Sequence, residues 1–296
     1  MTALTEPIDS PEAADEVAVA RPVASPLRRA LTAVRSPTLV IAWLIVLTVI
    51  AWAVAPQLFT HSNPLVGNPE QAFEAPSWHH LFGTDQLGRD MFSRVVYGSR
   101  NTLTATLYAV LVGFVAGGTI GLLSGYADGT TDAVVMRFID VLLSVPTLLL
   151  AMTVVAALGY GVLNVALAVG IVSIASFARV MRSQVLKVVQ SEYVEAARGL
   201  GSRWPRVLVL HVLPNSVRSV LSLAALEFGT AVLAVATLGF LGYGAPPPQP
   251  EWGLAVSEGR AFLDTYPWLA LIPGAVIAVV VLASNRISTA SRGRRR

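Results

Sequence analysis

Six long apolar stretches constrain the fold of this 296-residue chain more than any other feature of its sequence. Roughly 17–25 helical residues cross a hydrocarbon core about 30 Å thick. Only 13% of the residues are charged, whereas soluble globular domains carry about a quarter. We therefore expect an all-α membrane protein with six transmembrane helices, at residues 38–55, 101–124, 133–158, 162–178, 217–241 and 267–284.

The distribution of cationic side chains predicts the orientation of these helices. Of the 21 lysine and arginine residues, 17 lie in four places: before the first stretch, near the connection between the second and third stretches, near the connection between the fourth and fifth, and after the last stretch. The other four are Arg89, Arg94, Arg100 and Arg260. Because cytoplasmic loops are enriched in such cations, we expect both termini in the cytoplasm. Topology and contact with anionic membrane lipid then account for the net charge of +3, without a nucleic-acid partner.

Composition divides the chain into five segments. We expect a disordered cytoplasmic arm, an amphipathic interfacial helix, a first transmembrane helix with an outer loop, a transmembrane core and a basic cytoplasmic tail. These segments are residues 1–24, 25–36, 37–100, 101–285 and 286–296, and the core contains a long inner loop at 181–216.

Several kinds of chemistry are excluded by residue type. The chain has no cysteine, and its single lysine, Lys187, follows Leu186. A phosphate-binding loop of the GxxxxGK[ST] type needs glycine directly before its lysine, so ATP hydrolysis would have to come from another polypeptide. His79, His80 and Asp85 suggest a metal site, but adjacent side chains point in different directions and no further histidine lies close by. We expect that this chain is not an enzyme and that it holds no cofactor and no metal ion.

Ionisable and helix-breaking residues within the apolar stretches are candidates for a transport pathway. Arg137 and Asp140 share a helix face at i, i+3, which fits either a structural pair or a transport role. Pro146 removes one helical hydrogen bond, and a kink is tolerated where the helix packs on protein or lines a cavity. Glu227 lies in mid-stretch, so we expect it to face protein or water rather than lipid.

A glycine ladder marks the second apolar stretch. Gly113, Gly117, Gly121 and Gly125 recur every four residues. Small residues at this spacing let two helix backbones approach closely within a membrane. The partner helix can belong to this chain or to a second membrane subunit.

The inner loop at 181–216 is expected to form a helix–turn–helix. Ser191 can cap a first helix, and Val194 and Ala197 are placed on one side of it, with Leu200 as a further candidate for that side. Gly201 is expected to end this helix in a left-handed conformation. A second short helix would then reach Leu213, before Pro214 and Asn215 break the chain.

The same loop carries an EAAxxxG pattern followed by HVLPN. It resembles the signature loop of the permease subunits of ABC importers, which implies a coupling helix that seats in a groove of an ATPase subunit. The alternative is an ordinary amphipathic loop on the membrane surface. The resemblance rests on Glu195, Ala196, Ala197, Gly201, His211, Leu213, Pro214 and Asn215.

Two outer segments narrow the resemblance to the dipeptide, oligopeptide and nickel permeases. Residues 78–97 resemble their GTDxxGRDxxSR stretch, and residues 246–274 resemble their last outer loop. The latter implies contact with a binding protein or a gate, or else a membrane-surface helix anchored by Trp252. An acid of the family pattern is replaced by Val235. The outer candidates are Gly83, Asp85, Gly88, Arg89, Asp90 and Trp252.

This resemblance implies a type I ABC importer fold in the bacterial inner membrane, as the shorter-looped of two paired permeases. It implies a second homologous permease, two separate or fused ATPase subunits that hold ATP and Mg²⁺, and an extracytoplasmic substrate-binding protein. The cargo would be di- or oligopeptides, with nickel or another small solute as an alternative. A different class of protein stays open, namely an ion-driven secondary transporter with Asp140 and Glu227 as ion sites.

Overall fold

The structure is a computed structural model that describes residues 37–127 and 129–293, with side chains through residue 290. Regular structure in these ranges is helical, apart from one β-bridge between Thr84 and Asp90. The expected arm at 1–24 and the interfacial helix at 25–36 lie outside the described residues.

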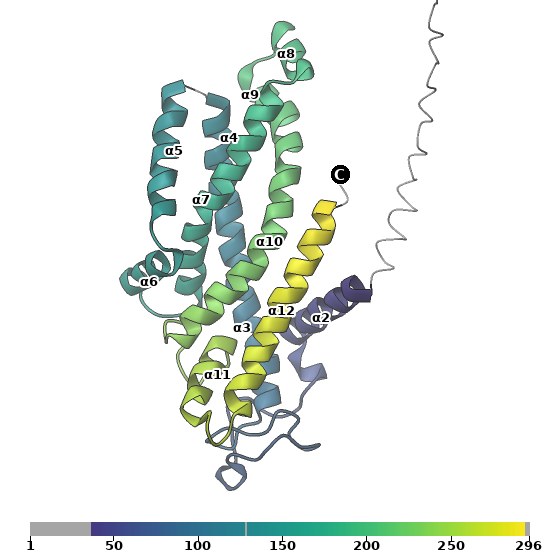
Figure 1. Ribbon diagram of the computed structural model, residues 1–296, viewed down its shortest axis with the longest axis vertical. Helices are drawn as coiled ribbons and strands as arrows, with labels where there is room; N and C mark the ends of the chain where they lie inside the picture. The colour runs from purple at the N-terminus through teal and green to yellow at the C-terminus, as the bar shows by residue number, and fades with distance from the viewer. Residues whose placement is uncertain (1–36, 128, 294–296) are drawn as a thin grey trace, which may run out of the picture.

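Five helices of the described chain are long and apolar enough to cross a membrane (Figure 1). They are α2 (Pro37–Val54), the continuous helix Met91–Ala127, α7 (Val162–Val189), the continuous helix Trp204–Phe240, and α12 (Trp268–Gly293). The second comprises α3 (Met91–Val112), a π-helical turn at Gly113–Gly117 and α4 (Gly118–Ala127). The fourth comprises α9 (Trp204–Val207), a π-helical turn at Leu208–Val212 and α10 (Leu213–Phe240).

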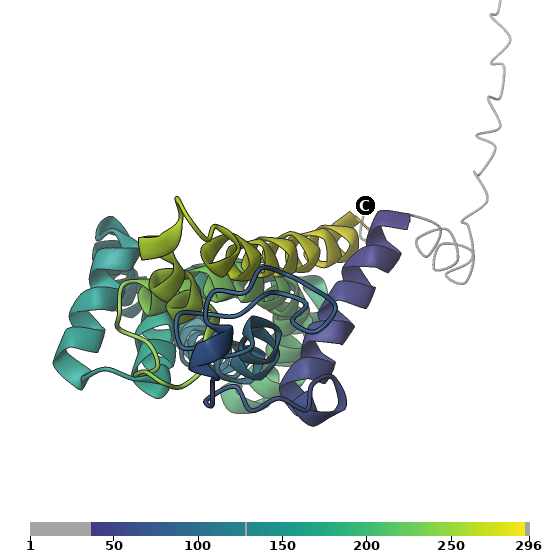
Figure 2. The ribbon, with the colours of Figure 1, turned by 90° about the horizontal axis from the view of Figure 1, so that it is seen from below.

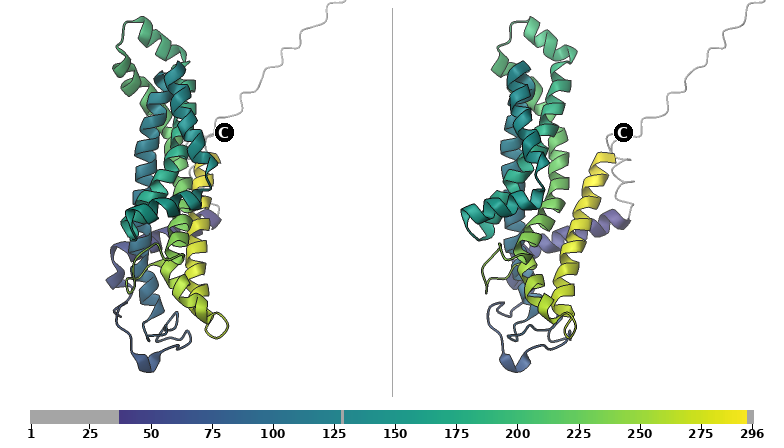
Figure 3. Two further views of the ribbon diagram at one scale, coloured as in Figure 1. Left: turned by 90° about the vertical axis from the view of Figure 1, so that its left-hand side faces the viewer. Right: turned by 60° about the vertical axis from the view of Figure 1, so that its left-hand side comes forward.

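Two further helices, which are long and apolar enough for a membrane span only when taken together, meet at a sharp bend. Helix α5 (Gly129–Ser144) and helix α6 (Thr147–Leu158) are bent by 95° relative to each other, and Figure 3 shows α6 lying crosswise. Pro146 stands at the bend with an extended ψ of 125°. Proline lacks an N–H and disfavours the helical conformation of the residue before it, so α5 ends at Ser144. The predicted kink is therefore confirmed.

The bent pair returns the chain from one end of the bundle toward the other. Helix α5 begins just after α4 ends, whereas the turn that follows α6 reaches the far end of α10, where Gly161 N donates to Tyr243 O at 3.2 Å. Counted as one crossing, α5 and α6 bring the candidate spans of the described chain to six, the number expected. Figure 2 shows this pair at one edge of the bundle and α2 at the opposite edge, beside α12.

Several helices extend beyond the predicted apolar stretches. The second begins at Met91 rather than 101, because Asp90 caps it by accepting a hydrogen bond from Ser93 N at 2.7 Å. Helix α7 continues to Val189 and α12 to Gly293. The predicted inner loop therefore begins with helix, and so does the predicted tail. The apolar pattern indicates only the part of each helix that lies within the membrane, whereas hydrogen bonding and packing extend these helices beyond that part.

The predicted chain break at Pro214 and Asn215 is wrong. Proline occupies the first turn of α10, where its missing N–H costs little, and the π-helical turn before it widens the backbone. Leu213 N donates to Leu208 O, and Asn215 Nδ2 donates to His211 O at 2.7 Å. The helix consequently runs unbroken through this site.

The glycine ladder packs within this chain, on α7. A Cβ atom added to Gly117 would lie 2.4 Å from Ile174 O, and one added to Gly121 would lie 2.2 Å from Ala178 O. Of the two alternatives, the structure supports packing inside the chain. A partly buried ion pair joins α7 to α5, since Arg182 Nε donates to Asp132 Oδ1 at 2.6 Å.

Candidate functional site

Helix α8 (Glu192–Gly199) protrudes at the end of the molecule between α7 and α9 (Figures 1 and 3). Gly201 has a φ of +79°, its N–H donates to Arg198 O at 2.9 Å, and Ser202 N donates to Ala197 O at 3.2 Å. These two bonds form a Schellman motif, which needs a left-handed residue just past the helix end. The predicted left-handed stop at Gly201 is confirmed.

The other end of α8 differs from the prediction. Ser191 occupies the N-cap position, but its side chain does not cap the helix. Its hydroxyl donates instead to Val188 O at 2.5 Å, in the last turn of α7. The hydroxyl thus ties α8 back to the end of α7.

Two contacts anchor α8 to the body of the molecule. Val194 is 0% exposed and belongs to a cluster with Val207 and Val212. The guanidinium of Arg198 lies 5.1 Å from the ring centre of Tyr126 at the end of α4, within the range of a cation–π interaction. Sequence analysis missed this pair, because nothing in the pattern of α8 indicates which residue of another helix lies below it.

The remaining surface of α8 is exposed and partly apolar. Leu200 is 87% exposed and Tyr193 is 46% exposed. Glu195 and Ala196 are exposed beside them, while Ala197 is half-buried. The predicted placement of Leu200 on the packed side is wrong, because Leu200 lies at the C-cap, where the chain turns away from the helix.

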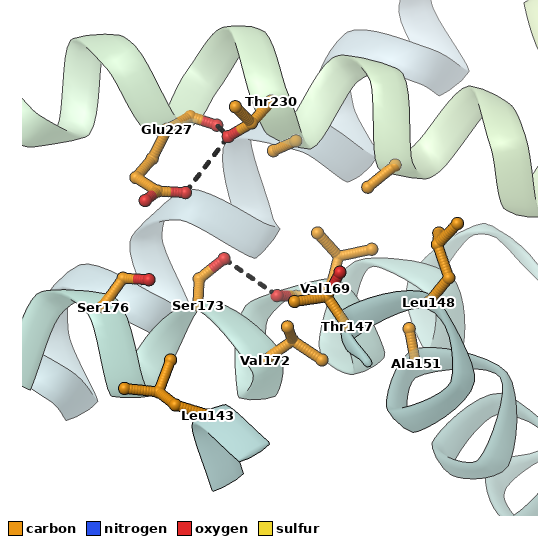
Figure 4. A pocket seen from close by; sticks show the side chains of 12 residues that line it. Leu143, Thr147, Leu148, Ala151, Val169, Val172, Ser173, Ser176, Glu227 and Thr230 are labelled. Atoms are coloured by element: carbon orange, nitrogen blue, oxygen red, sulfur yellow. Dashed lines mark hydrogen bonds between the residues drawn. The ribbon is translucent and has the colours of Figure 1, made fainter. Parts of the chain in front are cut away.

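A cavity of about 320 Å³ lies where the α5–α6 bend meets α7 and α10 (Figure 4). The half-buried Glu227 of α10 lines it, as expected for a carboxylate in mid-span. Thr230 Oγ1 lies 2.9 Å from Glu227 O and 3.1 Å from Glu227 Oε2, so its single proton is shared between them. The lining residues are Leu143, Thr147, Leu148, Ala151, Val169, Val172, Ser173, Ser176, Glu227, Thr230, Ala231 and Ala234.

Of the predicted intramembrane residues Asp140, Pro146 and Glu227, the structure brings only the last two together at this cavity. Pro146 directly precedes Thr147, which lines the cavity with Glu227. Asp140 lies outside this cavity, is exposed, and pairs with Arg179 of α7 at 2.5 Å. Of the two roles considered for Asp140, the structure contains an ion pair, but with Arg179 of α7 rather than with Arg137 of α5.

The predicted outer-loop motif forms a buried cap over the start of α3. Arg89 Nε donates to Asp85 Oδ2 at 2.6 Å, and Arg94 donates to Glu258 Oε2 at 2.7 Å. A Cβ atom added to Gly88 would lie 1.8 Å from Asn68 O, and Gly88 has a φ of +70°. Sequence analysis missed Arg94 and Glu258 as partners, because the two residues lie far apart in the chain.

Trp252 is an internal residue rather than a membrane-surface anchor. It is 0% exposed and its Nε1 donates to Val95 O at 2.9 Å. The preceding Glu251 caps α11 (Trp252–Gly259), accepting from Gly253 N and Leu254 N at 2.8 Å each. Burial raises the pKa of the Glu251 carboxyl, against the lowering effect of these hydrogen bonds.

All six predicted outer candidates are buried in the described chain. Contact of this outer region with a binding protein stays a prediction, and the six side-chain positions themselves have internal contacts. The six residues are Gly83, Asp85, Gly88, Arg89, Asp90 and Trp252.

Comparison with known proteins decides the class of this chain. Residues 117–296 match a family described as binding-protein-dependent transport system inner membrane component. The chain belongs to this permease family. The permease is 40% identical to the dipeptide transport system permease protein DppC of Alkalihalophilus pseudofirmus, over 90% of this chain and 88% of that relative.

Other relatives carry related names. The permease is 43% identical to the glutathione transport system permease protein GsiD of Pectobacterium atrosepticum, over 74% of this chain and 73% of the relative. It is 40% identical to the probable D,D-dipeptide transport system permease protein DdpC of Escherichia coli, over 84% of this chain and 83% of that relative.

Solved structures share the fold. A chain from an amino acid ABC transporter crystallised with histidines matches with a TM-score of 0.54 and 20% identity, over 69% of this chain and 95% of that chain. A chain from the inward-facing MetNI methionine ABC transporter matches with a TM-score of 0.53 and 18% identity, over 68% of this chain and 97% of that chain. The expected all-helical fold of an ABC importer permease is confirmed.

The permease is thus an inner-membrane subunit of an ABC importer of the peptide and glutathione type, and is not itself an enzyme. Family membership contradicts the alternative of an ion-driven secondary transporter.

Proposed function

We propose that the permease forms half of an ATP-driven pathway for short peptides or peptide-like solutes such as glutathione, and that α8 couples this pathway to ATPase subunits. The names of its relatives support the cargo. Dipeptides, D,D-dipeptides and glutathione differ in stereochemistry and linkage, but each carries a free ammonium group and a free carboxylate.

One observation carries the coupling proposal. Helix α8 joins the end of α7 to the start of the helix that contains α10, and these two helices supply Ser173 and Glu227 to the cavity at the α5–α6 bend. Coupling between two sites requires an element whose position both sites bias. A partner that moves α8 therefore acts directly on two walls of the cavity.

The surface of α8 fits a protein partner. Exposed apolar side chains on a protruding element are typical of protein interaction sites, and α8 presents Tyr193 and Leu200 in this way. The small Ala196 permits close approach of a groove, and the rigid turn at Gly201 fixes the direction of the helix. The Glu195, His211, Leu213, Pro214 and Asn215 positions complete the proposed coupling loop.

The proposed assembly places α8 and both termini in the cytoplasm, as the cation distribution favours. A second homologous permease completes the pathway, and two separate or fused ATPase subunits hold ATP and Mg²⁺. A substrate-binding protein delivers cargo to the opposite face. ATP binding closes the ATPase dimer, moves α8 and turns an inward-open pathway outward; hydrolysis resets it.

Cysteine crosslinking tests the coupling proposal, because the chain has no cysteine of its own. We expect Leu200→Cys to crosslink to an ATPase subunit in the assembled importer. The matched control, Glu70→Cys, lies exposed in the outer loop and should react only with a membrane-impermeant reagent added outside. Crosslinking of the ATPase to residue 70, or labelling of residue 200 from outside, would contradict both the coupling site and the orientation.

A further inference from the structure

The cavity at the α5–α6 bend contains one ionisable side chain among its described lining residues. That side chain is Glu227, and the polar remainder of the described lining consists of the hydroxyls of Thr147, Ser173, Ser176 and Thr230. Figure 4 shows the Glu227 side chain extending from α10 toward Ser173 and Ser176 of α7. A carboxylate and several hydroxyl oxygens therefore converge on one space.

The Glu227 carboxylate has no cationic partner among the described residues. Its polar contact there is Thr230, whose hydroxyl bonds mainly to the Glu227 carbonyl at 2.9 Å and lies 3.1 Å from Oε2. An ionised carboxylate in mid-membrane is costly unless it is paired or hydrated, and such residues mark transport pathways. An incoming cation would supply the missing charge, so the cavity favours a positively charged ligand.

We propose that Glu227 binds the ammonium group of the cargo as it passes through the permease. This inference rests on the proposed function as an importer of short peptides. The ammonium donates one hydrogen bond to the free Glu227 oxygen, and the Ser173 hydroxyl offers an oxygen acceptor from the facing helix. Such charge-assisted hydrogen bonds are among the stronger ones in proteins.

The size and place of the cavity favour a peptide terminus over a bare ion. A volume of about 320 Å³ admits a whole amino-acid residue, and its apolar walls, such as Leu148 and Val172, suit a small side chain. The cavity also lies between α7 and α10, the helices that α8 joins. Movement of α8 would therefore tighten or release the ammonium site.

Protection from alkylation tests this site without relying on transport. In the assembled importer, Ser176→Cys introduces a thiol into the wall of the cavity, in a chain that otherwise has no cysteine. We expect alanyl-alanine, at about ten times its dissociation constant, to slow alkylation roughly tenfold by mass action. N-acetyl-alanyl-alanine lacks the ammonium and should not protect.

The variants decide the role of the carboxylate. Protection should be lost when Ser176→Cys is combined with Glu227→Gln and should be partly kept with Glu227→Asp. The control, Glu70→Gln, changes a carboxylate in the outer loop and should leave protection intact.

Three results would overturn the proposal: equal protection by the acetylated peptide, protection that survives Glu227→Gln, or protection by sodium ions alone. A position 176 that no reagent reaches would also contradict it, because the cavity would then be closed to cargo. Crosslinking of Leu200→Cys to the ATPase, found together with any of these results, would leave the coupling proposal standing.

Discussion

Two glycines in one turn have opposite conformational demands. A Cβ atom added to either Gly199 or Gly201 meets nothing within 4 Å, but only Gly201 has a positive φ. We expect Gly201→Ala to destabilise the end of α8 by about 1–2 kcal/mol, the cost of a left-handed side-chain residue. Gly199→Ala lies within the helix and should stabilise it by up to about 1 kcal/mol.

Hydrogen exchange at the amides of α8 measures this difference. Exchange should become roughly 5- to 30-fold faster in Gly201→Ala, and equal or slower in Gly199→Ala. Similar acceleration in both variants would show that the left-handed turn does not hold the helix end.

At the residue level, sequence predicts local roles better than distant partners. The stop at Gly201 was predictable, because a left-handed helix end leaves a glycine in the sequence. The burial of Trp252 against Val95 was not, since aromatic residues near a membrane surface suit an interfacial anchor equally well. The Arg94–Glu258 pair likewise joins residues with no common local pattern.

At the level of the element, the glycine ladder sets the distance between α4 and α7. A Cβ atom added to Gly121 would lie 2.2 Å from the backbone oxygen of Ala178, whereas one added to Gly118 would lie 3.6 Å from the flexible end of Met181. We expect Gly121→Ala to destabilise the permease by about 1–3 kcal/mol, because it forces the helices apart. Gly118→Ala should be neutral or slightly stabilising, since alanine favours the helix.

Thermal unfolding of the purified permease in detergent compares these two variants. A lower midpoint for Gly121→Ala only is the expected result. Equal midpoints would mean that α4 and α7 do not pack as closely as the backbone distances indicate.

The number of helices was predictable from the apolar stretches, whereas their ends and irregular turns were not. Hydropathy marks where a helix meets lipid, but α7 continues to Val189 because Met181 and Val185 are buried against the body of the molecule. The break expected at Pro214 is absent, because a π-helical turn before it accommodates the proline. Such a turn depends on packing and has no distinct local sequence pattern.

For the whole molecule, α7 and the helix that contains α10 connect the protruding end at α8 to the cavity around Glu227. The protruding α8 connects α7 to the helix containing α10, and the same two helices carry the cavity around Glu227. The buried cap, in which Asp85, Arg89 and Arg94 are joined to Glu258, holds the opposite end. A displacement of α8 therefore reaches the cavity through continuous helices.

The most direct test of this account is ATP-driven dipeptide uptake by the reconstituted importer carrying Leu200→Glu. Leu200 is 87% exposed, so this variant should fold and enter the membrane normally, yet lose both ATPase binding and uptake. Val66→Glu, at a position 68% exposed in the outer loop, should keep the ATPase bound. Wild-type uptake by Leu200→Glu with ATP, or uptake by the unaltered importer driven by an ion gradient without ATP, would contradict the proposal that α8 couples this permease to an ATPase.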